Sequence, residues 1–191
     1  MSPSPAVVVT PYDPSWPSTF AWLRDRIAGP LAHLTTRIEH VGSTSVPGLA
    51  AKPVIDIDVV VADTTQMAHA SSILATLGYS PIGDLGIPDR HAFLAQAKLP
   101  RHNLYVALAT STALRNHLAI RDHLRGHPAD VIAYGELKKE LASEHPDDVD
   151  AYCTAKTRFL IGLLAKCGFA REELHEIARV NGIDPLESGI P

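Results

Sequence analysis

The feature that most constrains the fold is the run of residues 53–61, PVIDIDVVV, in which two aspartates alternate with aliphatic side chains. Successive side chains of a β-strand point to opposite faces, so Asp56 and Asp58 would share one face and the aliphatic residues the other. The Cα atoms of such alternate residues lie about 7 Å apart, so their carboxylates repel each other unless a cation lies near them. Mg²⁺ or Mn²⁺ prefers such hard oxygen ligands. The run therefore predicts either a metal-binding strand or an ordinary strand whose polar face is solvated.

A Gly-Ser dipeptide, Gly42-Ser43, precedes this strand by about a dozen residues. The backbone N–H groups of a glycine turn and a serine hydroxyl can approach an anion closely, so a phosphate beside the metal is a consistent hypothesis. His40 comes directly before the turn. It either orients the loop through a hydrogen bond or contacts the phosphate.

The remaining pattern alternates strands with helices and then becomes helical. The predicted strands are residues 6–10, 36–41, 53–61, 91–97 and 103–108, and the predicted helices begin near residues 13, 64, 112, 128, 147 and 171. Residues 91–97 and 103–108 are expected to form a hairpin. Gly29-Pro30 is expected to end the first helix, for which Asp13 would be the N-cap. This order favours a mixed sheet with packed helices.

Composition limits the class of protein. With 191 residues, 46% hydrophobic and 20% charged, the chain is expected to form a globular domain. No apolar run is long enough to span a membrane and the start lacks a signal peptide pattern, so a cytoplasmic location is expected. The net charge of −4 argues against nucleic acid binding through bulk charge. Cys153 and Cys167 would lie too far apart on one helix to pair.

Glycine-serine followed by Asp-aliphatic-Asp resembles the signature of the nucleotidyltransferase superfamily, which has a DNA polymerase β-like fold. The segments PYDPSW (11–16), IEHVGSTSVPGLAAKPVIDI (38–57), RDHLRGHP (121–128) and YGELKKELA (134–142) resemble the GrpB family. The resemblance spans roughly residues 6–166. It implies an α/β (α+β) domain at residues 1–170, with a sheet core at about 6–110 and a helical layer at about 111–170. A short helix and a loose tail are expected at 171–191.

The resemblance also implies roles for the motif residues. In the superfamily, two strand aspartates hold divalent metal and the Gly-Ser turn holds the triphosphate of a nucleotide. Asp56 and Asp58 match the first role, as catalytic and metal-binding residues, and Gly42 and Ser43 match the second.

A third carboxylate on a neighbouring strand often completes the superfamily's site, and this chain lacks it. The corresponding strand reads HNLYV at 102–106, where Asn103 and Tyr105 share one face. GrpB-like sequences tend to have a histidine in the place of Tyr105, and a neutral tyrosine is a poor Mg²⁺ ligand. A complete two-metal site and a general base are therefore in doubt, and one metal held by two aspartates and nucleotide phosphates is the remaining arrangement.

Transfer of a phosphoryl or nucleotidyl group also needs positive charge on the developing oxyanions. The basic residues near the motifs or inside the family-like segments are the candidates: Lys52, Arg90, Arg101, Arg121, Arg125, Lys138 and Lys156. For each of them a solvated surface position is the alternative. The histidines show no HExxH context, and His117, His123 and His127 do not form a tight zinc-ligand face.

The leading hypothesis is a metal-dependent nucleotidyltransferase that acts on a nucleoside triphosphate and an unidentified small-molecule or protein acceptor, with Mg²⁺ or Mn²⁺ as cofactor. A non-catalytic nucleotide- or phosphate-binding accessory module is the first alternative, because GrpB-like domains also occur fused behind a dephospho-coenzyme A kinase and the third carboxylate is missing. An enzyme of another reaction type, acting on a phosphorylated or carboxylated small molecule, is the second. The oligomeric state is left open.

Overall fold

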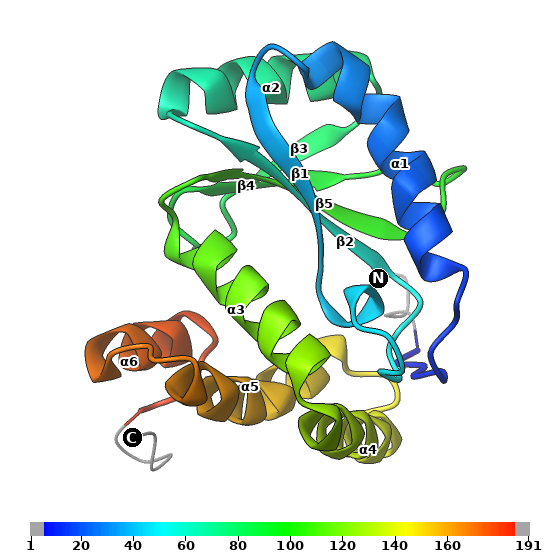
Figure 1. Cartoon of the computed structure of the whole chain (residues 1–191), viewed down its shortest axis with the longest axis vertical. Coiled ribbons are helices and arrows are strands. Elements are labelled where there is room, and N and C mark those ends of the chain that lie inside the picture. The colour runs from blue at the N-terminus through cyan, green and yellow to red at the C-terminus, as the bar shows by residue number, and fades with distance from the viewer. Residues whose placement is uncertain (1–5, 186–191) are drawn as a thin grey trace. The chain divides into compact units, whose positions relative to one another are not determined.

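The computed structural model describes residues 6–185. Its elements in chain order (Figure 1) are α1 Trp16–Leu31, β1 Thr35–Val41, the short 3-10 helix η1 Ser43–Ser45, β2 Ile55–Val61, α2 Thr64–Thr76, β3 Ser80–Gly83, β4 Arg90–Leu94, β5 His102–Leu108, α3 Thr112–Gly126, α4 Pro128–Glu144, α5 Val149–Lys166 and α6 Arg171–Val180. They form two compact units. The sheet unit comprises Asp13–Ser45 and Pro53–Leu118. The helical unit holds the other segments, which are described over residues 6–12, 46–52 and 119–185.

The sheet unit is built on a five-stranded sheet with the order β1-β2-β5-β4-β3. The β2–β5 pair is parallel and the other three pairs are antiparallel, so the predicted mixed sheet is confirmed. The expected hairpin is the β4–β5 pair. Strand β3 was not predicted, because its sequence SPIG contains a proline and a glycine and all four residues are exposed.

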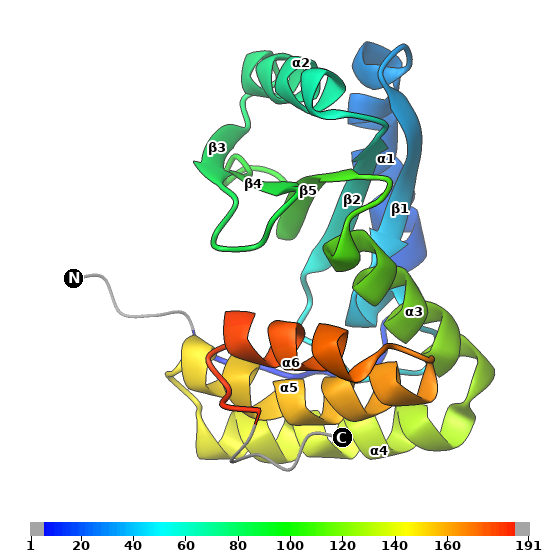
Figure 2. The same cartoon turned by 90° about the vertical axis from the view of Figure 1, so that its left-hand side faces the viewer.

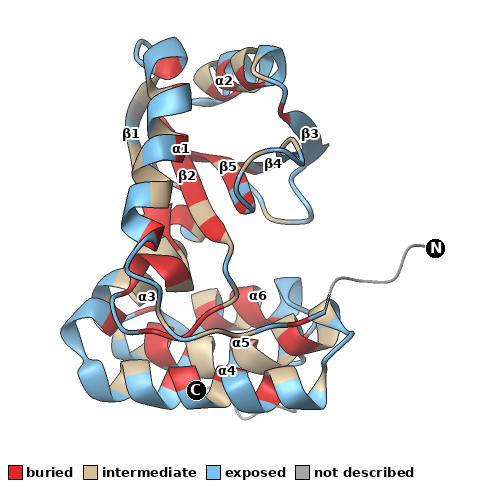
Figure 3. Ribbon diagram, turned by 90° about the vertical axis from the view of Figure 1, so that its right-hand side faces the viewer, coloured by how far each residue is buried: buried red, intermediate tan, exposed pale blue. Residues whose placement is uncertain are grey.

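Two helices cover one face of this sheet. Helix α1 packs on β1 and β2, α2 packs on β2, β3 and β5, and the two helices contact each other (Figure 1). The buried positions of α1 and α2 recur at helical spacing: Leu23, Ile27 and Leu31, then Met67, Ala70 and Leu74. Strand β2 lies between β1 and β5 and is buried along nearly its whole length, as Figure 3 shows. The residues of β2 that point away from α1 and α2 are the two aspartates and Val60.

Helix α3 begins on this second face. Leu114 and Leu118 pack against Val60 of β2 and Ala107 of β5. Because side chains alternate along a strand, Val60 points to the same face as Asp58. The first turns of α3 are therefore anchored beside the paired carboxylates.

Three expectations about the first part of the chain are wrong. Of residues 6–10, only Thr10 forms a β-bridge, to Ala51, and the segment is not a strand. Helix α1 has Ser15 as its N-cap, and Asp13 instead accepts a hydrogen bond from the Ser15 amide at 2.8 Å. Pro30 does not end α1, because it lies in the last turn of a helix that continues to Leu31.

The helical unit has its own apolar core. Helices α4, α5 and α6 run side by side (Figure 2), with α5 in contact with both of the others. One cluster joins Val46 and Leu49 to Leu124, Tyr134 and Leu163. None of the helices in the described part of the chain combines the length and the apolar character that crossing a membrane requires.

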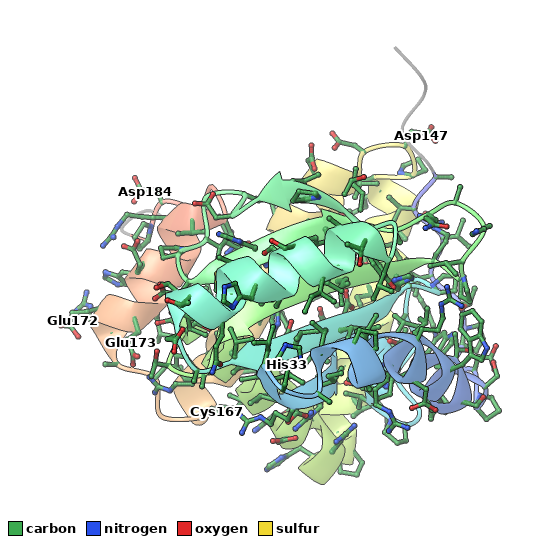
Figure 4. The ribbon with its side chains drawn as sticks, turned by 90° about the horizontal axis from the view of Figure 1, so that it is seen from above. His33, Asp147, Cys167, Glu172, Glu173 and Asp184 are labelled. Atoms are coloured by element: carbon green, nitrogen blue, oxygen red, sulfur yellow. The ribbon has the colours of Figure 1, made fainter. Side chains whose placement is uncertain are left out.

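Helix α6 carries Glu172 and Glu173 in its first turn (Figure 4), and Glu173 accepts a hydrogen bond from the Ala170 amide at 2.9 Å. After α6, Ile183 is 7% exposed and packs in a cluster with Leu174. The rest of the expected tail, residues 186–191, lies outside the described residues.

Candidate functional site

The Gly-Ser turn follows β1 and lies against the first aspartate of β2. Val41, the last residue of β1, pairs with Asp56 across the sheet. Gly42 has φ +69, and a Cβ atom added to it would meet Asp56 Oδ2 first, with Cγ at 2.7 Å and Cβ at 2.9 Å. Only glycine fits both this conformation and this approach. The carbonyl of Gly42 closes the turn by accepting from the Ser45 hydroxyl at 2.6 Å.

The two aspartates have different surroundings. Asp56 is half-buried, and its Oδ1 accepts a hydrogen bond from Asn103 Nδ2 at 2.7 Å. Asp58 is fully buried, and its Oδ2 lies 2.7 Å from His117 Nδ1. Within the described residues, Asp58 Oδ1 is buried and has no hydrogen-bond partner. A buried carboxylate oxygen without a donor is unfavourable, so this atom is suited to a cation.

His117 is the site residue that the sequence did not indicate. It lies on α3, 59 residues after Asp58, and no local pattern marks it. Burial by itself lowers the pKa of His117, but the charge of Asp58 and the hydrogen bond to it raise that pKa. With a further contribution from the charge of Asp56, the net result is a pKa above the ordinary 6.5. His117 therefore donates to Asp58 and fixes the orientation of its carboxylate.

Tyr105 occupies the place on β5 directly opposite Asp58. Its ring centroid lies 6.0 Å from that of His117. Strand β4 lies beside β5 on the side away from β2, and the Cζ atom of its residue Arg90 lies 4.4 Å from the Tyr105 ring centroid. Arg90 is buried, with 6% exposure, and its charge opposes the rise in the pKa of His117. The two strands beyond β2 thus contribute an aromatic ring and a buried cation on the side of Asp58.

His40 braces the turn from the other side. Its ring stacks on Phe20 with centroids 4.6 Å apart, and its Nε2 lies 3.0 Å from the Thr44 hydroxyl. That hydroxyl donates to the carbonyl of Val54 at 3.3 Å, so it accepts from His40. The geometry is that of a histidine that orients the loop, the first of its two predicted roles.

The three predicted lysines lie over the rings of two tyrosines in the helical unit. The Nζ atoms of Lys52 and Lys156 lie 5.2 and 5.4 Å from the ring centroid of Tyr152. Lys138 is only 2% exposed, and its Nζ lies 4.4 Å from the centroid of Tyr134. Burial raises the pKa of Tyr152 to about 12, against an opposing contribution from Lys156. These lysines, which we call the lysine group, concentrate positive charge over neutral phenol rings.

The predicted arginines are placed differently. Arg101 is exposed in the sheet unit, and its carbonyl accepts from the Ile55 amide at 3.1 Å at the start of the β2–β5 pair. Arg121, in the helical unit, has its Nε 2.7 Å from Asp122 Oδ1. Arg125 approaches the same carboxylate at 4.0 Å. Both helical arginines thus have an acidic neighbour on α3.

The residues present fit one divalent metal better than two. Asp56 and Asp58 share a face, and Asp58 Oδ1 is available to a cation. No group of three or more histidine, cysteine, aspartate or glutamate side chains in the described ranges could hold a metal ion. Any further ligands of such a metal would therefore come from other groups, such as water.

Comparison with known proteins identifies the family of this chain. The model of the GrpB protein family matches residues 6–166. The UPF0157 protein YqkA of Bacillus subtilis (strain 168) is 31% identical over 158 residues, which are 83% of this chain and 46% of YqkA. The chain thus spans less than half the length of that relative.

Solved structures give the same picture. The crystal structure of the conserved protein GrpB from Enterococcus faecalis superposes with a TM-score of 0.76 at 32% identity, covering 84% of this chain and 96% of that one. A Cid1 poly(U) polymerase structure, at 11% identity and a TM-score of 0.55, covers 80% of this chain and 49% of its own. This second likeness shows a nucleotidyltransferase-like fold. The chain belongs to the GrpB family.

Proposed function

We propose that this protein transfers a nucleotidyl group from a nucleoside triphosphate to an acceptor, with a divalent metal held by Asp56 and Asp58. The observation that carries the proposal is the buried, unpartnered Oδ1 of Asp58 on a strand whose other aspartate touches the Gly42-Ser43 turn. The nucleotidyltransferase-like sheet supports it. The acceptor is a small molecule or a protein side chain.

Each residue of the site has a task in this proposal. A bound Mg²⁺ or Mn²⁺ would supply positive charge to the phosphate oxygens. Asp56 and Asp58 would hold the metal, and His117 keeps the Asp58 carboxylate oriented. Gly42 and Ser43 would present backbone N–H groups to phosphate. Separately from this site, the lysine group of the helical unit is a candidate for binding phosphate.

The transfer step would form one P–O bond and break another. An acceptor hydroxyl would attack the α-phosphorus, and a new P–O bond would form. The bond to the β-phosphate oxygen would break, and pyrophosphate would leave with its electron pair. The hydroxyl proton would pass to solvent.

The proposal is tested by thermal unfolding with nucleoside triphosphates, in the presence and absence of Mg²⁺ or Mn²⁺. A ligand at about one hundred times its Kd stabilises the folded state by about 2.7 kcal/mol, which raises the Tm of a chain of this length by roughly 5–10 °C. We expect a metal-dependent rise in the wild type that the Asp56→Asn/Asp58→Asn variant loses.

The matched control is Asp25→Asn/Asp122→Asn, which removes the same charge from two exposed side chains. It should keep the metal-dependent rise. The proposal fails if no nucleotide stabilises the wild type, or if the Asp56→Asn/Asp58→Asn variant responds as the wild type does.

A non-catalytic binding module is the second candidate, and the position of Tyr105 favours it. Tyr105 lies opposite Asp58, where a third carboxylate would complete the metal site. A binding module would show the metal-dependent rise in Tm but release no pyrophosphate from any nucleotide. Pyrophosphate release that stops in the Asp56→Asn/Asp58→Asn variant would instead identify a transferase.

A further inference from the structure

Arg90 is a buried cation with one hydrogen-bond donor that its protein neighbours do not satisfy. The residue is 6% exposed, and within the described residues its Nε is a buried donor without a hydrogen-bond partner. Its Nη2 reaches only the carbonyl of Asp84, at 3.5 Å. In the same part of the chain it forms no ion pair with an aspartate or glutamate. A guanidinium is always charged, so burying its Nε–H without an acceptor is unfavourable.

The place of Arg90 connects it to the candidate metal site. On the sheet, Arg90 pairs with Ala107, and Tyr105 pairs with Asp58. The guanidinium lies over the Tyr105 ring at 4.4 Å, and that ring lies 6.0 Å from His117, which bonds Asp58 at 2.7 Å. These side chains form a row on the face of the sheet opposite α1 and α2, from β4 to β2.

The length of this row matches a small molecule. Strand β5 separates β4 from β2, and Arg90 pairs with Ala107, two residues beyond the partner of Asp58. With strands about 4.8 Å apart and about 7 Å between alternate residues, the backbone of Arg90 is roughly 12 Å from that of Asp58. A metabolite that contacts Arg90 with one end can reach the metal-binding carboxylates with the other.

We propose that Arg90 binds a carboxylate or phosphate group of the acceptor, which makes the acceptor a small anionic molecule. The planar guanidinium matches the two oxygens of such a group, and the unpartnered Nε is the donor that the oxyanion would satisfy. The assignment of this group to a nucleotidyl acceptor rests on the proposed transferase function. As a binding site for an oxyanion, it stands on the geometry of Arg90 alone.

The test follows the Nε–H signals of the arginines by NMR in the full chain labelled with ¹⁵N, without metal or nucleotide. Inorganic phosphate is titrated in one arm and acetate in the other. The Arg90 signal, identified by its loss in Arg90→Lys, should move downfield and saturate as its N–H gains an acceptor. Arg24, whose Nε already donates to Asp25 at 2.9 Å, is the reference.

The two arms separate the sources of the oxyanion, because saturation by only phosphate or only acetate assigns the group. Arg90→Lys keeps the charge and loses the planar fork, so it should bind the same probe about tenfold more weakly or worse. If the Arg90 signal only drifts with that of Arg24 in both arms, the inference is overturned. The titration itself uses wild-type protein, and Arg90→Lys, which keeps the charge, is needed only to assign the signal.

The oxyanion subsite at Arg90 and the proposed transferase function can fail independently of each other. If nucleotides raise the Tm with metal and Arg90 is silent, the transferase proposal stands and the oxyanion subsite falls. If Arg90 responds and no nucleotide binds, the subsite stands and its assignment to a nucleotidyl acceptor falls.

Discussion

Replacing Gly42 with alanine tests whether the Gly-Ser turn and the carboxylate of Asp56 really occupy adjacent space. The new Cβ would overlap Asp56 Oδ2 and lie 2.7 Å from its Cγ and 2.9 Å from its Cβ. These atoms follow a rigid strand position, so either the turn or β2 must shift. The φ of +69 adds a backbone cost, because the left-handed region is unfavourable for residues with a Cβ.

The magnitude follows from these two contributions. The left-handed backbone costs about 1–2 kcal/mol for alanine, and overpacking costs about 1–3 kcal/mol. Gly42→Ala should therefore lower the free energy of unfolding by about 2–5 kcal/mol. Gly83→Ala is the matched control in the same unit, because its φ is +81 and its Cβ would meet nothing within 4 Å. It should lose only about 1–2 kcal/mol.

Urea denaturation followed by tryptophan fluorescence measures both variants, since Trp16 and Trp22 both lie on α1 of the sheet unit. In a double-mutant cycle, Asp56→Ala removes the two nearest overlapping atoms, so Gly42→Ala should cost less in its presence by about 0.5–3 kcal/mol. Equal losses for Gly42→Ala and Gly83→Ala, or no coupling to Asp56, would refute the close contact.

Two further predictions concern the same unit. Burial lowers the pKa of His102 below 6.5, against an opposing backbone hydrogen bond to Pro100, and His102 Nε2 lies 3.0 Å from the Tyr79 hydroxyl. The unfolded state therefore binds more protons, so the free energy of unfolding should fall as pH falls through 6.5 toward the folded-state pKa of His102. This fall should be smaller in His102→Asn. Identical pH profiles of the wild type and the variant would contradict the prediction. Asp63 caps α2 by accepting from the Gln66 amide at 2.8 Å, so Asp63→Ala should cost about 0.5–2 kcal/mol in urea denaturation, while an unchanged midpoint would show that the cap contributes nothing.

The local sequence was sufficient for the core of the site. The period of two in residues 55–59 predicts a strand and places Asp56 and Asp58 on one face, and the structure has both. Asn103 and Tyr105 also share the predicted face of the neighbouring strand. Such patterns work because the alternation of side chains is a property of the strand itself and needs no knowledge of its partners.

Composition misled where a segment's partners decide its structure. The segment around Val7 is rich in β-branched residues, yet it packs against Leu141 and Tyr152 of the helical unit instead of joining the sheet. Strand β3 has poor strand residues, yet it pairs with β4. Strand propensity is largely a measure of packing against neighbours, so it fails when the neighbours are unknown.

The sequence by itself thus determined the carboxylate pair, the glycine turn and most of the strands and helices, because each follows from a local period or a local backbone requirement. Only the tertiary structure placed His117 on Asp58 and buried Arg90 over Tyr105. Both contacts join residues that are far apart in the chain, through the start of α3 on β2 and the register of β4 on β5. Strand pairing and helix packing set these contacts, and no short stretch of sequence encodes either of them.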